Sequence, residues 1–94
     1  MSKHTRLDNE APRRYQWITD GKENDVMSIG SCSSIIVEVT GDLKEPVELC
    51  GGLVSGDHLL EVIRRPGLYA ISPVRMLRPK TKQSGITVTF MGVQ

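Results

Sequence analysis

The chain has 94 residues, of which 38% are hydrophobic and 24% are charged, and this balance indicates one globular domain with no room for a second. Aromatic residues make up only 4%, which argues against an aromatic-lined ligand pocket and against a stacking platform for single-stranded nucleic acid. The formal net charge of +1 gives the chain no strong overall attraction to DNA or to an anionic membrane surface.

The first part of the chain, residues 1–14, is polar and carries both charge signs, and its only large apolar residue besides Met1 is Leu7. Such a stretch cannot offset its ordering entropy by burial, so we expect an extended arm before a domain of residues 15–94. The arm is either a frayed terminus or a segment that orders on a partner. It has no hydrophobic centre, which argues against a secretory signal, and no apolar run in the chain reaches the ~20 residues that span a bilayer.

From Tyr15 onward the pattern is that of β-strands. The first segment ends at the turn signal Asp20-Gly21, and a short apolar segment at 26–29 follows. The clearest strand covers 34–40, where β-branched residues dominate and apolar residues alternate with others. The residues expected on its buried face are Ile35, Val37 and Val39.

Five further apolar segments follow, at 46–50, 58–63, 68–71, 74–77 and 86–91. The last of them alternates cleanly, with three apolar residues on one face. The segment 58–63 is too short for a stable helix, 46–50 ends at Gly51-Gly52, and Ser72-Pro73 separates 68–71 from 74–77. We therefore interpret all five segments as strands.

Prolines interrupt the second half of the chain. Pro66 prevents the segment before it from extending as a helix, and with Gly67 it forms a turn signal. Pro73 and Pro79 lack the amide N–H that a sheet ladder uses, so they predict that 74–77 lies at a sheet edge or at a bulge.

Seven or eight short strands at intervals of roughly 8–12 residues are typical of a small all-β protein. The expected fold is a single antiparallel β-sandwich, either Ig-like or jelly-roll, with the extended N-terminal arm in front of it. No helical periodicity persists beyond two turns.

The charges are segregated along the chain. Residues 1–34 carry five basic and five acidic side chains, residues 35–61 carry one basic and six acidic, and residues 62–94 carry six basic and no acidic. Three interpretations compete: cross-strand pairing within the fold, contact between copies or with an acidic partner surface, and a basic patch for nucleic acid. The six acids in the same small domain argue against nucleic acid.

Arginine makes the better anchors for a partner because guanidinium bonds bidentately, and the candidate partner-binding residues are Arg13, Arg14, Arg64, Arg65, Arg75 and Arg78.

Two histidines and two cysteines are the obvious candidates for a metal site. His4, His58, Cys32 and Cys50 show neither the C-x-x-C nor the H-x₃₋₅-H spacing of a zinc site. We therefore expect no metal and no cofactor, and we interpret the two cysteines as buried or half-buried thiols. They could form one bridge only if their strands face each other.

The run of Ser55, Asp57 and His58 contains the residue types of a nucleophile triad. Neighbours in sequence point in different directions, and the run lies in a glycine-bounded turn, where Asp and Ser cap backbone groups. The glycines fit neither a P-loop nor a dinucleotide fingerprint. The sequence thus predicts a protein that is not an enzyme.

The order of segments from Ile29 to Val93 resembles that of the small Ig-like or jelly-roll accessory proteins of tailed bacteriophage virions. The strand GSCSSIIVEVTGD is followed by PVELCGG, then by the turn and strand PGLYAI, a basic connection and the closing strand GITVTFMGV. About two-thirds of the chain takes part, and the resemblance consists of strand order and turns.

The resemblance implies a structural role without cofactor or active site. The expected function is that of a capsid decoration (cement) protein, which docks in multiple copies on the viral shell, is made in the host cytoplasm and becomes part of the virion. The alternatives are a head–tail or tail accessory protein, or a small nucleic-acid-binding β-barrel that uses the basic stretch 64–82.

Overall fold

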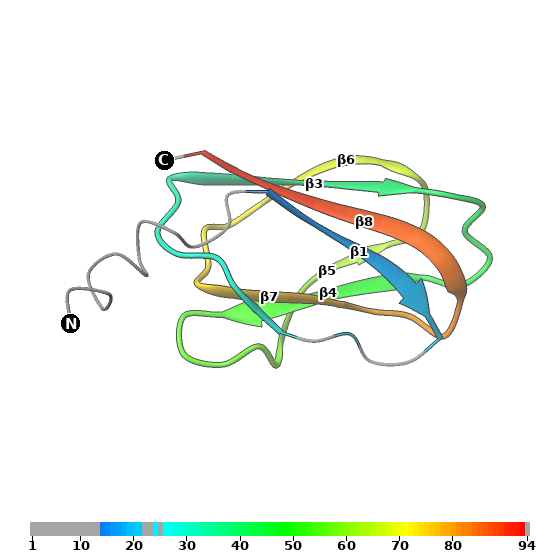
Figure 1. Ribbon diagram of the computed structural model, residues 1–94, viewed down its shortest axis with the longest axis horizontal. Helices are drawn as coiled ribbons and strands as arrows, with labels where there is room; N and C mark the ends of the chain where they lie inside the picture. Colours follow the sequence, from blue (N-terminus) through cyan, green and yellow to red (C-terminus); the bar gives the residue numbers. More distant parts are fainter. Residues whose placement is uncertain (1–13, 22–23, 25, 94) are drawn as a thin grey trace.

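The computed structural model describes residues 14–21, 24 and 26–93, and these residues form eight β-strands (Figure 1). The strands are β1 (Arg14–Asp20), β2 (Met27–Ser28), β3 (Ser34–Thr40), β4 (Val47–Gly52), β5 (His58–Ile63), β6 (Gly67–Ile71), β7 (Met76–Lys80) and β8 (Ser84–Val93). The part of the chain that the structure describes contains no helix, and therefore no helix long and apolar enough to cross a membrane.

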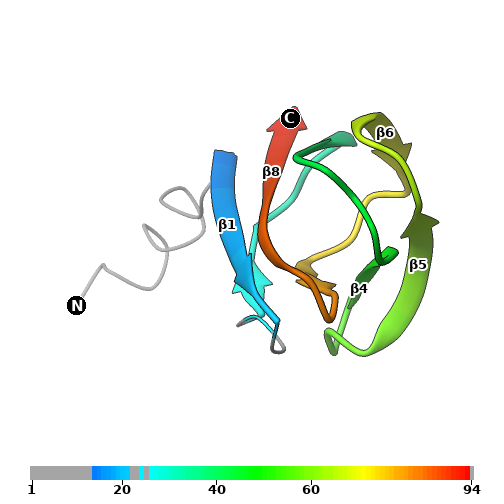
Figure 2. The same cartoon turned by 90° about the vertical axis from the view of Figure 1, so that its right-hand side faces the viewer.

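The strands form two antiparallel sheets that pack face to face. Sheet A has the order β1-β8-β3-β6, and sheet B has the order β2-β7-β4-β5. Viewed along the strands, the two sheets curve around one common interior (Figure 2). The predicted all-β antiparallel sandwich is therefore confirmed.

The pairing pattern distinguishes between the two predicted kinds of sandwich. β1 pairs with β8, β2 with β7, β3 with β6, and β4 with β5. The chain thus forms a nested series of antiparallel pairs, and the further pairs β3·β8 and β4·β7 join these into sheets. Two four-stranded sheets with this nesting are the double Greek key of an eight-stranded jelly roll. The Ig-like alternative requires a different distribution of strands between the sheets.

The core lies between the sheets and consists of inward-facing residues from both of them. β3 shows the predicted alternation without exception, because its second, fourth and sixth residues are buried. The largest side chains of the interior are aliphatic apart from Phe90 and Trp17. The fully enclosed ones include Phe90, Ile29, Ile35, Leu49, Ile63, Leu77 and Ile86.

Two predicted strands have the same boundaries in the structure, whereas the closing strand predicted at 86–91 extends over 84–93 and the one predicted at 46–50 covers 47–52. The strand predicted at 34–40 is β3, and the segment 58–63, which Pro66 keeps from forming a helix, is β5. The predicted domain began at Tyr15, whereas β1 begins one residue earlier, at Arg14. The remainder of the predicted arm, residues 1–13, lies outside the described residues.

The prediction that the proline-flanked segment lies at a sheet edge was wrong for Met76 and Leu77, which have partner strands on both sides, and it holds locally at Pro79. β7 is an internal strand of sheet B between β2 and β4, although Pro79 lies within it. Pro79 is tolerated because β2 pairs only with Met76 and Leu77. Beyond that two-residue ladder, the described sheet continues on the β4 side alone, where Pro79 is opposite Leu49. Pro73 lies outside the strands, in the connection between β6 and β7.

Candidate functional site

The structure distributes the predicted partner-binding arginines over the molecule instead of gathering them. Arg64 and Arg65 are exposed in the β5–β6 connection, and Arg75 is exposed just before β7. Arg14 is exposed at the start of β1, and Arg13 lies outside the described residues.

The two ends of the sandwich separate these arginines. β5 ends beside Val47 at the start of β4, whereas β7 begins beside Gly52 at the end of β4. Arg64 and Arg75 therefore lie beyond opposite ends of β4, which is roughly 17–20 Å long by the rise of a six-residue strand. The basic stretch 64–82 does not form one continuous patch.

Arg78 has a partner within the fold. It lies on β7 with its side chain 17% exposed, and its Nη2 donates a hydrogen bond to Oδ1 of Asp57 at 2.7 Å. On the same face of sheet B, Glu48 of β4 is directly opposite Lys80 of β7. The bond between Arg78 and Asp57 is one internal charge pair of the predicted kind, and it leaves Arg78 less available to an external partner.

The residues of the triad-like run serve the structure of a turn. Asp57 precedes β5 and binds Arg78, while the exposed His58 begins β5 opposite Gly51. Within the described residues, no group of three or more His, Cys, Asp or Glu side chains could hold a metal ion, and His4 lies outside those residues.

The cysteines are thiols in separate surroundings. Cys50 is buried in β4 opposite Arg78. Cys32 is half-buried in the β2–β3 connection, with its Sγ 3.8 Å from the carbonyl oxygen of Ile29. The prediction of one buried or half-buried environment for each thiol is confirmed.

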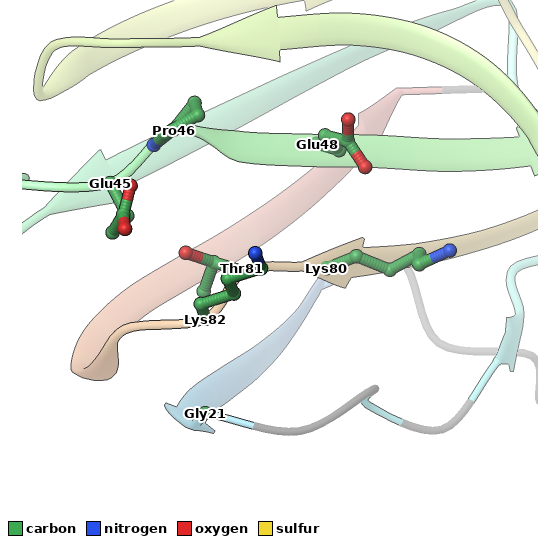
Figure 3. Close-up of a pocket in the computed structure, with 7 residues that line it drawn as sticks. All are labelled: Gly21, Glu45, Pro46, Glu48, Lys80, Thr81 and Lys82. Atoms are coloured by element: carbon green, nitrogen blue, oxygen red, sulfur yellow. The ribbon is translucent and has the colours of Figure 1, made fainter.

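A hollow of about 370 Å³ lies where β4 begins and β7 ends (Figure 3). Its lining consists of Gly21, Glu45, Pro46, Glu48, Lys80, Thr81 and Lys82. Two carboxylates and two ammonium groups balance each other in charge, and the lining offers no aromatic side chain, thiol or imidazole. Its apolar area comes from Pro46 and from the aliphatic parts of polar and charged side chains, and no large hydrophobic side chain lines it. The mostly hydrophobic and aromatic lining of a typical small-molecule site is different.

A larger surface feature lies on the side of sheet A that faces away from sheet B. Residues directly opposite each other in an antiparallel pair share a face. The register therefore shows which residues of the neighbouring strands lie on the same side of the sheet as the outward residues of β3. Ile36 alternates with the buried residues of β3, and it is opposite Met91 of β8 and Ala70 of β6. Met91 is in turn opposite Arg14 of β1. These four residues form one row across the four strands.

A second row runs parallel to the first, two residues further along β3. Glu38 is opposite Thr89 of β8 and Leu68 of β6, and Thr89 is opposite Gln16 of β1. The Nε2 of Gln16 donates a hydrogen bond to Oγ1 of Thr89 at 3.2 Å. Together with Glu38, Gln16 covers Thr89, which is why this outward threonine is only 3% exposed.

We call the outward-pointing residues of β1, β8, β3 and β6 the sheet A outer face. Its large aliphatic side chains are unusually open to solvent: Ile18 and Leu68 are 66% exposed, Val93 is 55% exposed and Ile36 is 37% exposed. Across the rows where β1, β8 and β3 all pair, the outward charged residues are Arg14 and Glu38. The complete set of apolar residues on this face is Ile18, Ile36, Leu68, Ala70, Met91 and Val93.

The size of the sheet A outer face follows from strand geometry. Four strands about 4.8 Å apart and the outward rows along β8 cover roughly 19 by 23 Å, or about 450 Å². Polar residues share that area, because the row of Gln16, Thr89 and Glu38 lies between Ile18 and the row of Ile36 and Met91. The largest exposed apolar patch on a typical monomer covers about 300–600 Å² and is often functional. The sheet A outer face is therefore the candidate functional site.

The sequence contained a signal for this face that the charge-based prediction did not use. Ile36 occupies the outward phase of β3, where a sandwich exposed to water would have a polar residue. Leu68 and Ala70 occupy the same phase of β6. Their significance depends on the register, because only the pairing of β3 with β6 and β8 brings them together.

The chain matches no protein-family model, no curated protein and no solved structure. The surface geometry of the described residues is therefore the basis on which a function is proposed.

Proposed function

We propose that this protein is a non-enzymatic structural component of a viral particle, present in many copies, that docks on the shell as a decoration protein. The observation that supports the proposal is the sheet A outer face, an open aliphatic surface on a sandwich whose core is already complete. Such a surface favours association with protein, because burying it removes apolar area from water without leaving many charges unpaired.

The jelly-roll order adds to this support by analogy. Two-sheet jelly rolls occur in viral capsid domains as well as in lectins and cupins. The functions of such folds depend on their sites, and the sheet A outer face exposes four large aliphatic side chains that suit association with protein. A structural role is the function that agrees best with this surface.

The exposed arginines at the two ends of the sandwich suit contacts with the shell. Arg64 and Arg65 lie side by side in the β5–β6 connection, and Arg75 lies beyond the other end. Charged groups at the rim of an interface mainly set orientation and association rate. In this proposal the arginines orient the protein on an acidic shell surface.

Sedimentation of the source lysate tests the proposal. The chain is quantified in the particle pellet and in the supernatant by isotope-labelled copies of its tryptic peptides 45–64 and 65–75. Abundance in the pellet close to that of the main shell protein is the expected result for a decoration protein. A few copies per particle would assign it to the head–tail connection or tail instead, and recovery only in the supernatant would refute a virion role.

A matched pair of variants tests the arginines. Arg64→Glu should weaken co-sedimentation of the purified protein with particles about tenfold, as truncation of an arginine anchor typically does. Lys44→Glu is the control, because Lys44 is also exposed and lies in the connection at the same end of the sandwich. Equal effects of the two substitutions would show that only overall charge matters.

A further inference from the structure

We propose that two copies of this chain pair face to face through the sheet A outer face, with Arg14 of each copy beside Glu38 of the other. The inference rests on the proposed function, because it identifies the contact that joins copies in the assembly. Two properties of the face support a second copy as its partner: the order of its strands and the position of its two charges.

The strand order makes the face compatible with two-fold symmetry. β8 is flanked by β1 on one side and by β3 on the other. Sheets that pack face to face keep their strands within about 30° of each other. A two-fold axis between the two sheets and along β8 therefore brings β8 over β8 and β1 of each copy over β3 of the other.

The same symmetry brings unlike charges together. Arg14 lies on β1 and Glu38 lies on β3, so each faces the strand that holds the other in the second copy. The register places them two residues apart along the strands, since Arg14 is in the row of Ile36. That offset is roughly 7 Å, which the long arginine side chain can bridge. In an isologous interface the pair forms twice.

Apolar contact accounts for the rest of the interface. Met91 lies outward on β8, next to the proposed axis, and Ile36 lies beside it on β3. In the dimer Ile36 lies over β1 of the other copy. Both side chains lose water in the dimer, so they supply attraction while the charge pairs determine which arrangement forms.

The area indicates how strong the contact is. Because the axis lies along β8, only β1, β8 and β3 of the two copies overlap and β6 stays uncovered. Two areas of about 14 by 23 Å bury about 660 Å² in total, which is well below the ~1,200 Å² of a standard stable interface. We therefore expect a weak and reversible contact. On a particle, where copies are held close together, such a weak contact is strengthened by effective concentration.

Sedimentation velocity of the purified full chain from about 1 to 500 µM tests the pairing. The expected result is a reversible shift from monomer to dimer within this range. A chain that remains monomeric at 500 µM would overturn the inference, and so would a shift to open-ended larger species, because the isologous contact closes at two copies.

Charge exchange tests the proposed arrangement. Arg14→Glu and Glu38→Arg each convert two attractive pairs into two repulsive ones, so each single variant should raise the dissociation constant at least tenfold. The double variant restores two attractive pairs and should return within about threefold of the wild type. Failure of the double variant to recover would refute the contact between Arg14 and Glu38.

Two substitutions to lysine test the face itself. Ile36→Lys should abolish dimerisation, whereas Val54→Lys, at a residue 87% exposed in the β4–β5 connection, should leave it unchanged. Circular dichroism must show that the variants fold, and if Ile36→Lys does not, Ile18→Lys replaces it on the same face. Equal effects of the substitutions at 36 and 54 would overturn the inference.

The outcomes separate this inference from the proposed function. A monomeric wild-type chain that still sediments with particles would refute the pairing and retain the virion role. If Ile36→Lys then prevented sedimentation with particles, the face would bind the shell and not a second copy. A dimer that is absent from particles would retain the pairing and refute the virion role.

Discussion

A buried threonine fastens the first strand to the β7–β8 connection and to β8, and its replacement gives a quantitative test of the fold. Thr19 is 2% exposed and lies where the register between β1 and β8 shifts, between Ile18 and Asp20. Its Oγ1 donates a hydrogen bond to the carbonyl oxygen of Gln83 at 2.8 Å and accepts one from the amide N of Ile86 at 3.0 Å. The hydroxyl thus supplies the connection that the ladder loses at the shift.

The substitution Thr19→Val preserves the shape of the side chain and removes both hydrogen bonds. Each bond contributes about 1 kcal/mol net, and a buried amide left without a partner costs about 1–3 kcal/mol. We expect the free energy of unfolding to fall by about 2–3 kcal/mol. For a chain of this size, whose total stability is about 5–14 kcal/mol, this corresponds to a melting temperature lower by about 10–20 °C.

Urea denaturation followed by tryptophan fluorescence measures this change, because Trp17 is the only tryptophan and is 5% exposed in the core. Thr19→Ser is the control, since it keeps the hydroxyl and loses one methyl group at a cost of about 1 kcal/mol. The valine variant should be clearly less stable than the serine variant. A valine variant as stable as the serine variant would refute the role of the hydroxyl.

Three other substitutions test packing and connections. Phe90→Ala removes the largest fully buried side chain and should lower the free energy of unfolding by about 3–5 kcal/mol in urea titration; a loss under 1 kcal/mol would contradict the packed core. Gly51→Ala places a methyl group against the carbonyl oxygen of Met76, so we expect a loss of about 3 kcal/mol by calorimetry, and wild-type stability would show that β4 and β7 can separate there. Gln83→Ala removes the side chain whose Oε1 accepts hydrogen bonds from the amides of Lys44 and Glu45. Exchange of these two amides with deuterium should accelerate about tenfold, and unchanged rates would show that the Gln83 side chain does not protect them.

The individual strands could be predicted from the sequence because their signals are local. The strand at 34–40 combines β-branched residues with strict alternation, and both features depend on neighbours within the segment. The internal position of β7 in sheet B could not be predicted, because the rule for prolines assumes that an internal strand has partners along its whole length. Here the neighbouring β2 is only two residues long.

The candidate site could be predicted less well because it depends on distant pairings. Charge alone suggested the arginines, yet Arg78 binds Asp57 and Arg75 lies at the opposite end from Arg64. The sheet A outer face exists only because β8 pairs with both β1 and β3. No local pattern contains that information, so the face becomes visible only when the register is known.

The nested pairing of the jelly roll also has a consequence for the time course of synthesis. Only β4 and β5 are both consecutive in the chain and directly paired, so the innermost hairpin is the first that can form on a growing chain. β8, in contrast, pairs with both β1 and β3. Sheet A consequently cannot form completely until residues 84–93 have left the ribosome. In the described sheet β8 is the only partner of β1, so β1 remains unpaired until almost the whole of the described domain has been made. Because its pairings span so much of the chain, this domain should fold slowly for its size and only after its synthesis is complete.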